Sequence, residues 1–277
     1  MPEGPEIRLA ADRIANVLVG ERVEDAYFSM PKLRRHARRV VGAHVTAVDT
    51  RGKAMLTRFD SGLTLYSHNQ LYGRWYATSP GRAPKTTRSL RVALHTAQGS
   101  AWLYSASDIA LLSERGLERH PFLSRIGPDV LDVGLNAADI LTRLDEDRFQ
   151  RRALGALYLD QAFLAGIGNY LRSEILFCAG IDPSRKPMEL SGVELSRLAR
   201  ETLSLSRRSY RTRGVLVPPS LVRKLKGEGQ SYREYRFWVF ARGGLPCRRC
   251  GEPVERLTAG SRGLYVCKRC QSRPRLV

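Results

Sequence analysis

The first residues of the chain, Met-Pro-Glu-Gly-Pro-Glu, hold a pair of groups suited to covalent chemistry. Removal of Met1 would leave Pro2 as a free secondary amine. An α-amino group titrates near ~7.7–8.0, so part of it is unprotonated at cellular pH. Attack of that amine on an aldehyde-level carbon gives an iminium ion, which draws electrons during elimination. Glu3 could move the protons of such a reaction. The alternative is a proline that merely follows the start codon.

Four of the five cysteines form two C-x2-C pairs separated by sixteen residues, namely Cys247, Cys250, Cys267 and Cys270. This spacing is typical of a structural zinc site with four thiolate ligands. Two disulfides are the alternative, which a cytosolic location would disfavour. Because no ligand position is left for water, the predicted Zn²⁺ has a structural role. We expect Cys178, in an apolar helical stretch, to be a buried small residue.

Between the cysteine pairs, two alternating segments flank a glycine-containing turn, which predicts a β-hairpin. The segments cover residues 254–257 and 264–266, and Arg262 lies near the expected tip. Arg262 could reach a phosphate or a lesion, or it could be one exposed arginine among many.

The charge of the chain indicates the class of partner. Its 46 Lys and Arg residues exceed its 27 Asp and Glu residues, giving a formal net charge of +19. Such an excess favours a polyanion, most simply nucleic acid, bound with salt-sensitive affinity. A ribosome-bound or membrane-surface protein could carry the same charge. Only seven of the basic residues are lysines, and lysine, unlike arginine, can release a proton in a suitable environment.

The chain has no apolar run of 18 residues and no basic-then-apolar signal pattern at its start. We therefore expect no membrane span and a cytoplasmic, nucleoid-associated location. No dinucleotide or phosphate-loop motif occurs, so no organic cofactor is expected. A monomer is expected.

The elements that must position these residues differ between the two halves of the chain. Residues 5–19 have the apolar spacing of a helix, and short alternating strands follow from about Val23 to Trp102. Many short strands at this spacing favour an antiparallel β-sandwich or barrel. Gly127-Pro128 then interrupts regular structure and suggests a connector between domains.

The second half has helical patterns. Helices are predicted over 153–165 and 169–179, and a capping box at Ser191 and Glu194 begins another that runs to about Arg207. Residues 211–236 have little regular pattern, and we expect a mobile loop there. The predicted fold is α+β, with a β-sandwich carrying a long first helix at 1–125, a linker at 126–135, a helical domain at 136–236 and a zinc hairpin at 237–277.

Four motifs in this order resemble those of the formamidopyrimidine-DNA glycosylase and endonuclease VIII family, and together they cover nearly the whole chain. They are the Met-Pro-Glu start, the strand-flanked Arg51-Gly52-Lys53, the stretch from Asp160 to Leu171 and the terminal cysteine hairpin. The resemblance implies that residues 160–171 form a helix–two-turns–helix motif. The start and the stretch Tyr-Ser-His-Asn-Gln-Leu-Tyr-Gly at 66–73 are most similar to the bacterial endonuclease VIII branch.

The resemblance implies a catalytic set of Pro2, Glu3, Lys53 and Arg262. Pro2 attacks C1′ of the damaged nucleotide and forms a Schiff base, while Glu3 assists proton transfer at the sugar ring oxygen. Lys53 contacts phosphate and supplies a proton, unless it is only a surface hairpin lysine. Arg262 takes part in the second elimination. Because a guanidinium holds its proton tightly, we expect it to anchor phosphate there.

The resemblance also implies DNA contacts. Gln70, Leu71 and Tyr72 would fill the gap left by an everted nucleotide, although composition alone would place Leu71 and Tyr72 in a core. Asn169 begins a helix after two glycines, and helix N-termini bind phosphate. Arg125, beside the connector, could grip the backbone or be a solvated charge.

The expected function is that of a bifunctional DNA glycosylase and abasic-site lyase of base excision repair. It would remove oxidised pyrimidines from double-stranded DNA, the expected partner, and then carry out β,δ-elimination. One alternative keeps this mechanism but prefers oxidised purines. Another is a zinc-bearing nucleic-acid-binding protein without catalysis, which would leave the Pro2–Glu3 pair and Lys53 unexplained.

Overall fold

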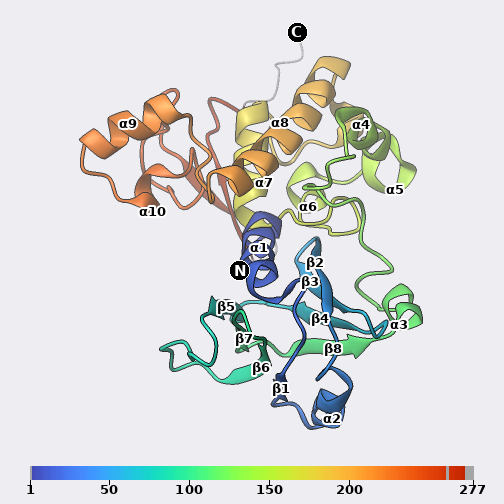
Figure 1. Ribbon diagram of the computed structural model, residues 1–277. Helices are drawn as coiled ribbons and strands as arrows, with labels where there is room; N and C mark the ends of the chain where they lie inside the picture. The colour runs from blue at the N-terminus through green and yellow to red at the C-terminus, as the bar shows by residue number, and fades with distance from the viewer. Residues whose placement is uncertain (1, 260–261, 272–277) are drawn as a thin grey trace. The chain divides into compact units, whose positions relative to one another are not determined.

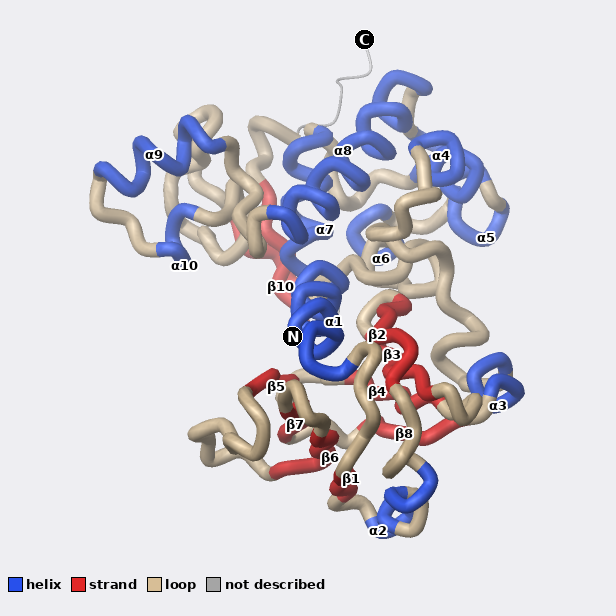
Figure 2. The backbone as a smooth tube through the Cα atoms, viewed as in Figure 1, coloured by secondary structure: helices blue, strands red, loops and turns tan. Residues whose placement is uncertain are grey.

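The structure is a computed structural model that describes residues 2–259 and 262–271. The chain divides into two compact units, unit 1 ending at Ile126 and unit 2 beginning at Gly127 (Figure 1). Strands make up most of the regular structure of unit 1, whereas unit 2 is mainly helical (Figure 2). Within the described residues, no helix is long and apolar enough to cross a membrane.

Unit 1 is the predicted antiparallel β-sandwich. One sheet has the strand order β2-β3-β4-β8 and the other the order β1-β6-β7-β5. Side chains from both sheets fill one core, which includes Val48, Leu65, Leu94 and Leu103. The strands are β1 Asp25–Phe28, β2 Val45–Arg51, β3 Ala54–Phe59, β4 Thr64–His68, β5 Arg74–Thr78, β6 Leu90–His95, β7 Ser100–Tyr104 and β8 Asp108–Leu112. Short helical segments are α2 Pro31–Arg34, η1 Ala37–Arg39 and α3 Glu114–Glu118.

The first helix, α1 (Gly4–Leu18), packs against strands β2 and β5. Its buried apolar residues recur every three or four positions, which is the stripe expected of a helix on a core; they are Ile7, Ala11, Ile14 and Leu18. The prediction of a helix over residues 5–19 is confirmed to within a residue at each end.

Contacts along α1 fix its direction relative to β2. Val19, just after the helix, forms a bridge with Val45 at the start of β2. Earlier in the helix, the Arg8 guanidinium donates to the Val48 carbonyl, further along β2, at 3.5 Å. The N-terminal end of α1 therefore points toward the end of β2 at Arg51.

Unit 2 is built around two helices, α7 (Asn169–Ala179) and α8 (Gly192–Arg211). The predicted capping box of α8 is present, since Ser191 Oγ accepts from the Glu194 N–H at 3.3 Å and Glu194 Oε2 accepts from the Ser191 N–H at 2.8 Å. The remaining elements are α4 Ala137–Asp145, α5 Asp147–Gln150, α6 Leu154–Leu157, η2 Pro187–Glu189, α9 Pro219–Gly227, α10 Tyr232–Tyr235, β9 Glu255–Ala259 and β10 Arg262–Val266.

The predicted helix over 153–165 is wrong beyond its first turn, because the structure has only α6 there. In residues 160–167, side chains form hydrogen bonds with the backbone instead. Asp160 Oδ1 accepts from the Ala162 N–H at 2.8 Å, and the Gln161 amide bonds both Ile167 O at 2.9 Å and the Gly166 N–H at 3.1 Å. Such local side-chain bonds compete with helix formation and shape the turns before α7.

The expectation of an irregular loop at 211–236 is also wrong, because α9 and α10 form within it. Pro219 lies in the first turn of α9, where the missing N–H of a proline is tolerated. Leu225 is the buried residue of α9, and Lys226 lies over the ring of Tyr235 at 5.3 Å from its centroid. Pro218 and Pro219 are therefore the N-cap and the first residue of a helix.

Candidate functional site

The N-terminal end of α1 holds the predicted amine and its acidic neighbour. Glu3 is the N-cap residue of α1 and is only 3% exposed. Its backbone N–H donates to Glu6 Oε2 at 3.0 Å, as in a capping box. Pro2 is half-buried beside it, and Met1 lies outside the described residues. The positive end of the helix dipole favours the Glu3 carboxylate.

Lys53 lies in the two-residue turn between β2 and β3. The preceding Gly52 has a φ of +60°, a left-handed conformation that favours glycine. The Lys53 residue is 5% exposed, which is rare for lysine because desolvating an ammonium is costly. This turn places a cation inside the protein, unlike an ordinary surface hairpin lysine.

The start of α1, the β2–β3 turn and the β4–β5 connection lie at the same end of the sandwich in unit 1. Ala54, next to Lys53, pairs with His68, the last residue of β4. Lys53 is therefore next to the β4–β5 connection that carries the Gln-Leu-Tyr triplet. The N-terminal end of α1 points the same way, so Glu3 is at this end as well.

The triplet forms the tip of the β4–β5 connection. Leu71 is 53% exposed and Tyr72 is 67% exposed, so neither is a core residue. Gln70 has a φ of +50°, an uncommon conformation for a residue other than glycine. Two large apolar side chains are thus presented to solvent at the end of the sandwich that holds Lys53.

A group of side chains that the sequence analysis did not single out lies beside the triplet. His68 Nδ1 accepts from the Gln70 N–H at 3.0 Å, and the Tyr66 hydroxyl donates to Asp108 Oδ2 at 3.2 Å. Burial lowers the pKa of His68; the charge of Asp108 opposes that shift and the charge of Lys53 adds to it. Period-two alternation predicts the strand, but it cannot show which neighbours His68 meets.

Arg125 lies near the end of unit 1 and is exposed. Its guanidinium Nε donates to the Pro121 carbonyl at 2.7 Å. This bond fixes one edge of a guanidinium that lies at the protein surface.

Unit 2 brings together Asn169 and the hairpin that carries Arg262, the first residue of β10. The Asn169 amide donates to the carbonyl of Gly263, next to Arg262, at 2.7 Å. Arg172, fully buried, donates to Asn169 Oδ1 at 2.5 Å and to the Gly155 carbonyl at 2.7 Å. The Asn169 side chain therefore contacts the hairpin. Residues 260 and 261, between β9 and β10 in the sequence, lie outside the described part of the chain.

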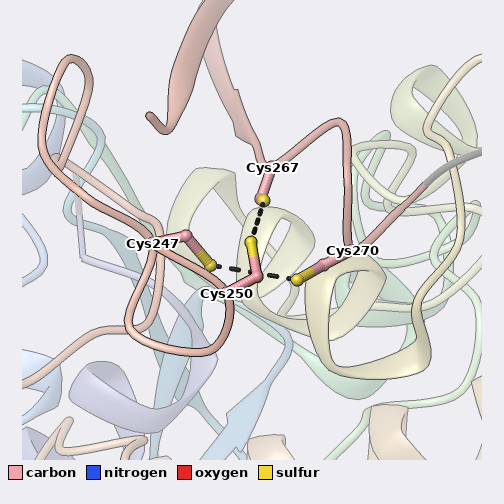
Figure 3. A group of neighbouring side chains, drawn as sticks. All are labelled: Cys247, Cys250, Cys267 and Cys270. Carbon is pink, nitrogen blue, oxygen red and sulfur yellow. Dashed lines mark hydrogen bonds between the residues drawn. The ribbon is translucent and has the colours of Figure 1, made fainter. Parts of the chain in front are cut away.

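The four paired cysteines converge (Figure 3). Their Sγ atoms all lie within 4.8 Å of one another, with Cys250–Cys267 at 3.4 Å and Cys247–Cys270 at 3.9 Å. A tetrahedral Zn²⁺ with Zn–S bonds of about 2.3 Å has S–S edges of about 3.8 Å. A disulfide would need about 2.05 Å, and all four residues are free cysteines. The cluster fits a four-thiolate zinc site, and the disulfide alternative is wrong.

Glu174 on α7 is a second group that the sequence analysis missed. It is fully buried, and its carboxylate accepts from three consecutive backbone N–H groups, those of Trp238 at 2.8 Å, Val239 at 2.9 Å and Phe240 at 2.9 Å. Burial raises the pKa of Glu174, and the three N–H groups counteract part of that shift. Glu174 is the one acidic residue in the largely apolar sequence of α7, and this feature could have indicated a buried carboxyl group.

Three family models match the chain in order. They are the formamidopyrimidine-DNA glycosylase N-terminal domain over residues 1–107, the formamidopyrimidine-DNA glycosylase H2TH domain over 126–216, and a zinc finger found in FPG and IleRS over 244–273. The predicted helix–two-turns–helix region and the cysteine hairpin each lie within one of these matches.

Curated relatives named Endonuclease 8 match over nearly the full chain. One from Escherichia coli is 49% identical and one from Shigella sonnei is 48% identical, each covering 98% of this chain and 100% of the relative. Among solved structures, two complexes of Lactococcus lactis Fpg have the same fold. The complex with an N7-benzyl-Fapy-dG-containing DNA has a TM-score of 0.80 at 19% identity, and that with an abasic-site DNA 0.80 at 18%. Both comparisons cover 98% of this chain and 100% of that one.

Proposed function

The chain belongs to the formamidopyrimidine-DNA glycosylase and endonuclease VIII family of base-excision DNA glycosylases with abasic-site lyase activity, and we propose that it removes oxidised pyrimidines through a Schiff base on Pro2. One observation carries the proposal: buried Glu3, buried Lys53 and the exposed triplet occupy the same end of the β-sandwich. We also propose that the protein acts as a monomer on damaged DNA of the cytoplasmic nucleoid.

In the glycosylase step, the lone pair of the Pro2 nitrogen attacks C1′ of the damaged nucleotide. The N-glycosyl bond breaks, and its electron pair leaves with the base, which takes up a proton. The attached nitrogen, now an ammonium, releases the proton that balances the one taken up by the base. Glu3 then protonates the ring oxygen as the C1′–O4′ bond opens and the freed nitrogen lone pair forms the iminium. Lys53, at the same end of the sandwich, supplies an ammonium to a phosphate and a proton to the reaction.

In the lyase steps, the iminium acidifies the C2′ protons. Loss of one such proton expels the 3′ phosphate, and a second elimination, through C4′, expels the 5′ phosphate. Water then hydrolyses the imine and restores the Pro2 amine. Arg262 stabilises the departing phosphate by a charge-assisted hydrogen bond, because a guanidinium is a strong donor to phosphate and a poor acid.

The nucleotide must leave the helix before C1′ can meet Pro2, at a cost of a few kcal/mol of stacking and pairing. We propose that Leu71 enters the vacated space, that Gln70 bonds the orphaned base and that Tyr72 stacks beside it. Their exposure supports this role. Arg125 and the N-terminal end of α7, at Asn169, would bind the DNA backbone.

The four cysteines would hold one Zn²⁺, whose chemistry is structural because thiolates fill every coordination position. The bound ion would fix the position of the β9–β10 hairpin, which includes Arg262.

Preference for pyrimidines follows from the Gln-Leu-Tyr triplet, and an excision assay tests it. Duplexes that differ only in carrying an oxidised pyrimidine or a formamidopyrimidine purine lesion are compared at equal enzyme concentration. We expect the pyrimidine lesion to be excised faster, by about tenfold, which corresponds to about 1.4 kcal/mol of barrier. Equal rates, or faster purine excision, would support the purine-preferring alternative.

The Schiff base is tested by borohydride trapping on abasic DNA. Borohydride reduces the iminium to a stable amine, so the adduct should map by peptide mass to Pro2, with Met1 absent from the intact protein. Pro2→Gly should trap much less, since it replaces the secondary amine, and Glu3→Gln should slow trapping without moving the adduct. An adduct on another residue, or full trapping by Pro2→Gly with Met1 retained, contradicts the mechanism.

A further inference from the structure

We propose that His68 is a positioning residue that holds Gln70 in its left-handed backbone conformation and so presents the Gln70-Leu71-Tyr72 triplet to the duplex. The inference rests on the proposed function, in which this triplet fills the space of the everted nucleotide.

The triplet needs external support because its conformation is unfavourable. Gln70 has a φ of +50°, and a non-glycine residue in that region costs about 1 kcal/mol or more. Leu71 and Tyr72 are largely exposed and so contribute little burial that could offset this cost. Contacts from neighbouring residues must therefore keep the tip in place.

His68 supplies the contact closest to the strained residue. Its Nδ1 accepts from the Gln70 N–H, two positions along the chain, at 3.0 Å. The geometry is analogous to an Asx-turn, in which a side-chain acceptor bonds the backbone two residues on. The Ser107 hydroxyl also donates to Gln70 Oε1 at 2.6 Å, so both the backbone and the side chain of Gln70 are fixed.

Further hydrogen bonds hold the rest of the β4–β5 connection next to Gln70. The Gly73 N–H donates to the Asn69 carbonyl at 2.7 Å, and Arg88 donates to the Tyr72 carbonyl at 2.5 Å. A Cβ at Gly73 would lie 2.6 Å from that Asn69 oxygen, so only glycine fits there. These contacts close the base of the loop, and the His68 bond, with that of Ser107, acts at its tip.

His68 is itself held by the sheet. It pairs with Ala54 as the last residue of β4, and its ring meets the Phe122 ring edge-on at 5.5 Å. Asp108 of β8 and Lys53 of the β2–β3 turn are the charged groups that influence it. A side chain fixed on the sandwich thus links the position of Lys53 to that of the triplet.

The bond to Gln70 requires neutral His68, because an imidazolium has no lone pair on Nδ1. Burial, reinforced by Lys53 and opposed by Asp108, holds the pKa of His68 below its ordinary value. The bond is therefore present at neutral pH and is lost as the pH falls through that lowered pKa.

The test compares two reactions of the full-length enzyme. One is excision of an oxidised pyrimidine from a duplex, which needs the triplet. The other is cleavage of an abasic site in a single strand, where no base is everted. His68→Phe keeps the ring but removes the acceptor, whereas His68→Asn keeps an acceptor at the same point of the turn. His44→Phe, at a histidine whose side chain is 54% exposed, is the matched control.

We expect His68→Phe to lower the duplex rate about tenfold, or about 1.4 kcal/mol of barrier, while its single-strand rate falls much less. His68→Asn should restore most of the duplex rate. On acidification, the duplex-to-single-strand ratio should fall for the wild type and stay flat for His68→Asn. This pH arm carries the test if His68→Phe does not fold.

Leu71→Ala separates failure of this inference from failure of the triplet assignment. If Leu71→Ala lowers the ratio but neither His68→Phe nor acidification does, His68 does not position the triplet. Equal losses of both rates in His68→Phe, without rescue by His68→Asn, also overturn the inference. If Leu71→Ala leaves the ratio unchanged, the triplet is not the wedge and the proposed function fails at that point.

Discussion

Lys53 and Arg262 are both proposed phosphate-binding cations at the turns of antiparallel hairpins, yet the two hairpins are held differently. The β2–β3 hairpin is part of a four-stranded sheet whose inner face lies on the apolar core of unit 1. The β9–β10 hairpin pairs only with itself among the described strands, and a two-stranded hairpin alone is marginally stable in water. Its position must come from other contacts.

Polar contacts from α7, the cysteine cluster and a small apolar cluster around Phe177 supply that support. Asn169 bonds the Gly263 carbonyl, Ser173 Oγ accepts from the Tyr265 N–H at 3.4 Å, and Glu174 bonds the chain that leads to the hairpin. The Lys53 turn therefore belongs to a sheet on a large apolar core, whereas the Arg262 hairpin is held by the cysteine cluster, a few hydrogen bonds and a small apolar cluster that includes Phe177 and Val254. The two should therefore respond differently to mutation.

The largest effect is expected from breaking the cysteine cluster. Cys267→Ser, at a fully buried cysteine of the cluster, should abolish the proposed zinc binding and unfold the hairpin, because binding of a structural zinc contributes roughly 10–16 kcal/mol in small finger peptides. Duplex excision and the second elimination should fall strongly, while Pro2 should still be trapped on single-stranded abasic DNA. Metal content and the ratio of β to δ products measure the outcome.

Cys178→Ser is the matched control, since Cys178 lies outside the cluster. It should keep its zinc and its δ product. If Cys267→Ser lost Pro2 trapping to the same extent as δ-elimination, the expected difference between the two hairpins would be contradicted.

This contrast also explains what the sequence could predict. Helix α1 and the sandwich follow from local periodicity, and the cysteine spacing specifies its own geometry. Asn169 was expected at a helix start, and it does begin α7. Its bond to Gly263, which joins residues 94 positions apart, has no local signature. The same holds for Glu174 and the backbone at 238–240.

The errors have local causes as well. The lack of regular pattern over 211–236 predicts a loop, but proline is favoured in the first turn of a helix, and α9 begins at Pro219. In 153–165, apolar spacing suggested a helix, while Asp160 and Gln161 captured the backbone in turns. In each segment the local sequence is compatible with both a helix and a non-helical structure, and contacts with other parts of unit 2 determine which one forms.

An intermediate effect is expected at Glu174. Glu174→Gln replaces an acceptor oxygen by an amide that cannot accept, so one buried N–H loses its partner, at a cost of about 1–3 kcal/mol. Glu228→Gln, at a side chain that is 49% exposed, should have almost no effect. Thermal unfolding of both variants measures the difference.

The pH dependence of this difference has a defined sign. Because burial raises the pKa of Glu174 in the folded protein, its stabilising contribution is complete below the unfolded pKa, about 4.3, and declines as the pH rises through the raised value. The stability advantage of the wild type over Glu174→Gln should therefore shrink with increasing pH. An advantage that grows with pH would mean that the N–H groups outweigh burial.

The smallest effect on stability, and the sharpest comparison, is expected at two glycine turns of unit 1. Gly52 and Gly62 have φ values of +60° and +75°, so an alanine at either position should cost about 1 kcal/mol. Only Gly52→Ala should also slow the lyase reaction, because it shifts Lys53. Unfolding free energies and single-turnover lyase rates of the pair test this, and equal lyase rates would show that Lys53 tolerates displacement.

The cap at the beginning of α1 gives one residue two duties. Glu3 is the N-cap residue of the helix, with its main chain fixed by Glu6, and its carboxylate is the proposed proton carrier. A substitution of Glu3 would therefore affect both the start of α1 and the proposed proton transfer. Changes in substrate range are easier to acquire at the exposed tip, where a new side chain disturbs little of the scaffold.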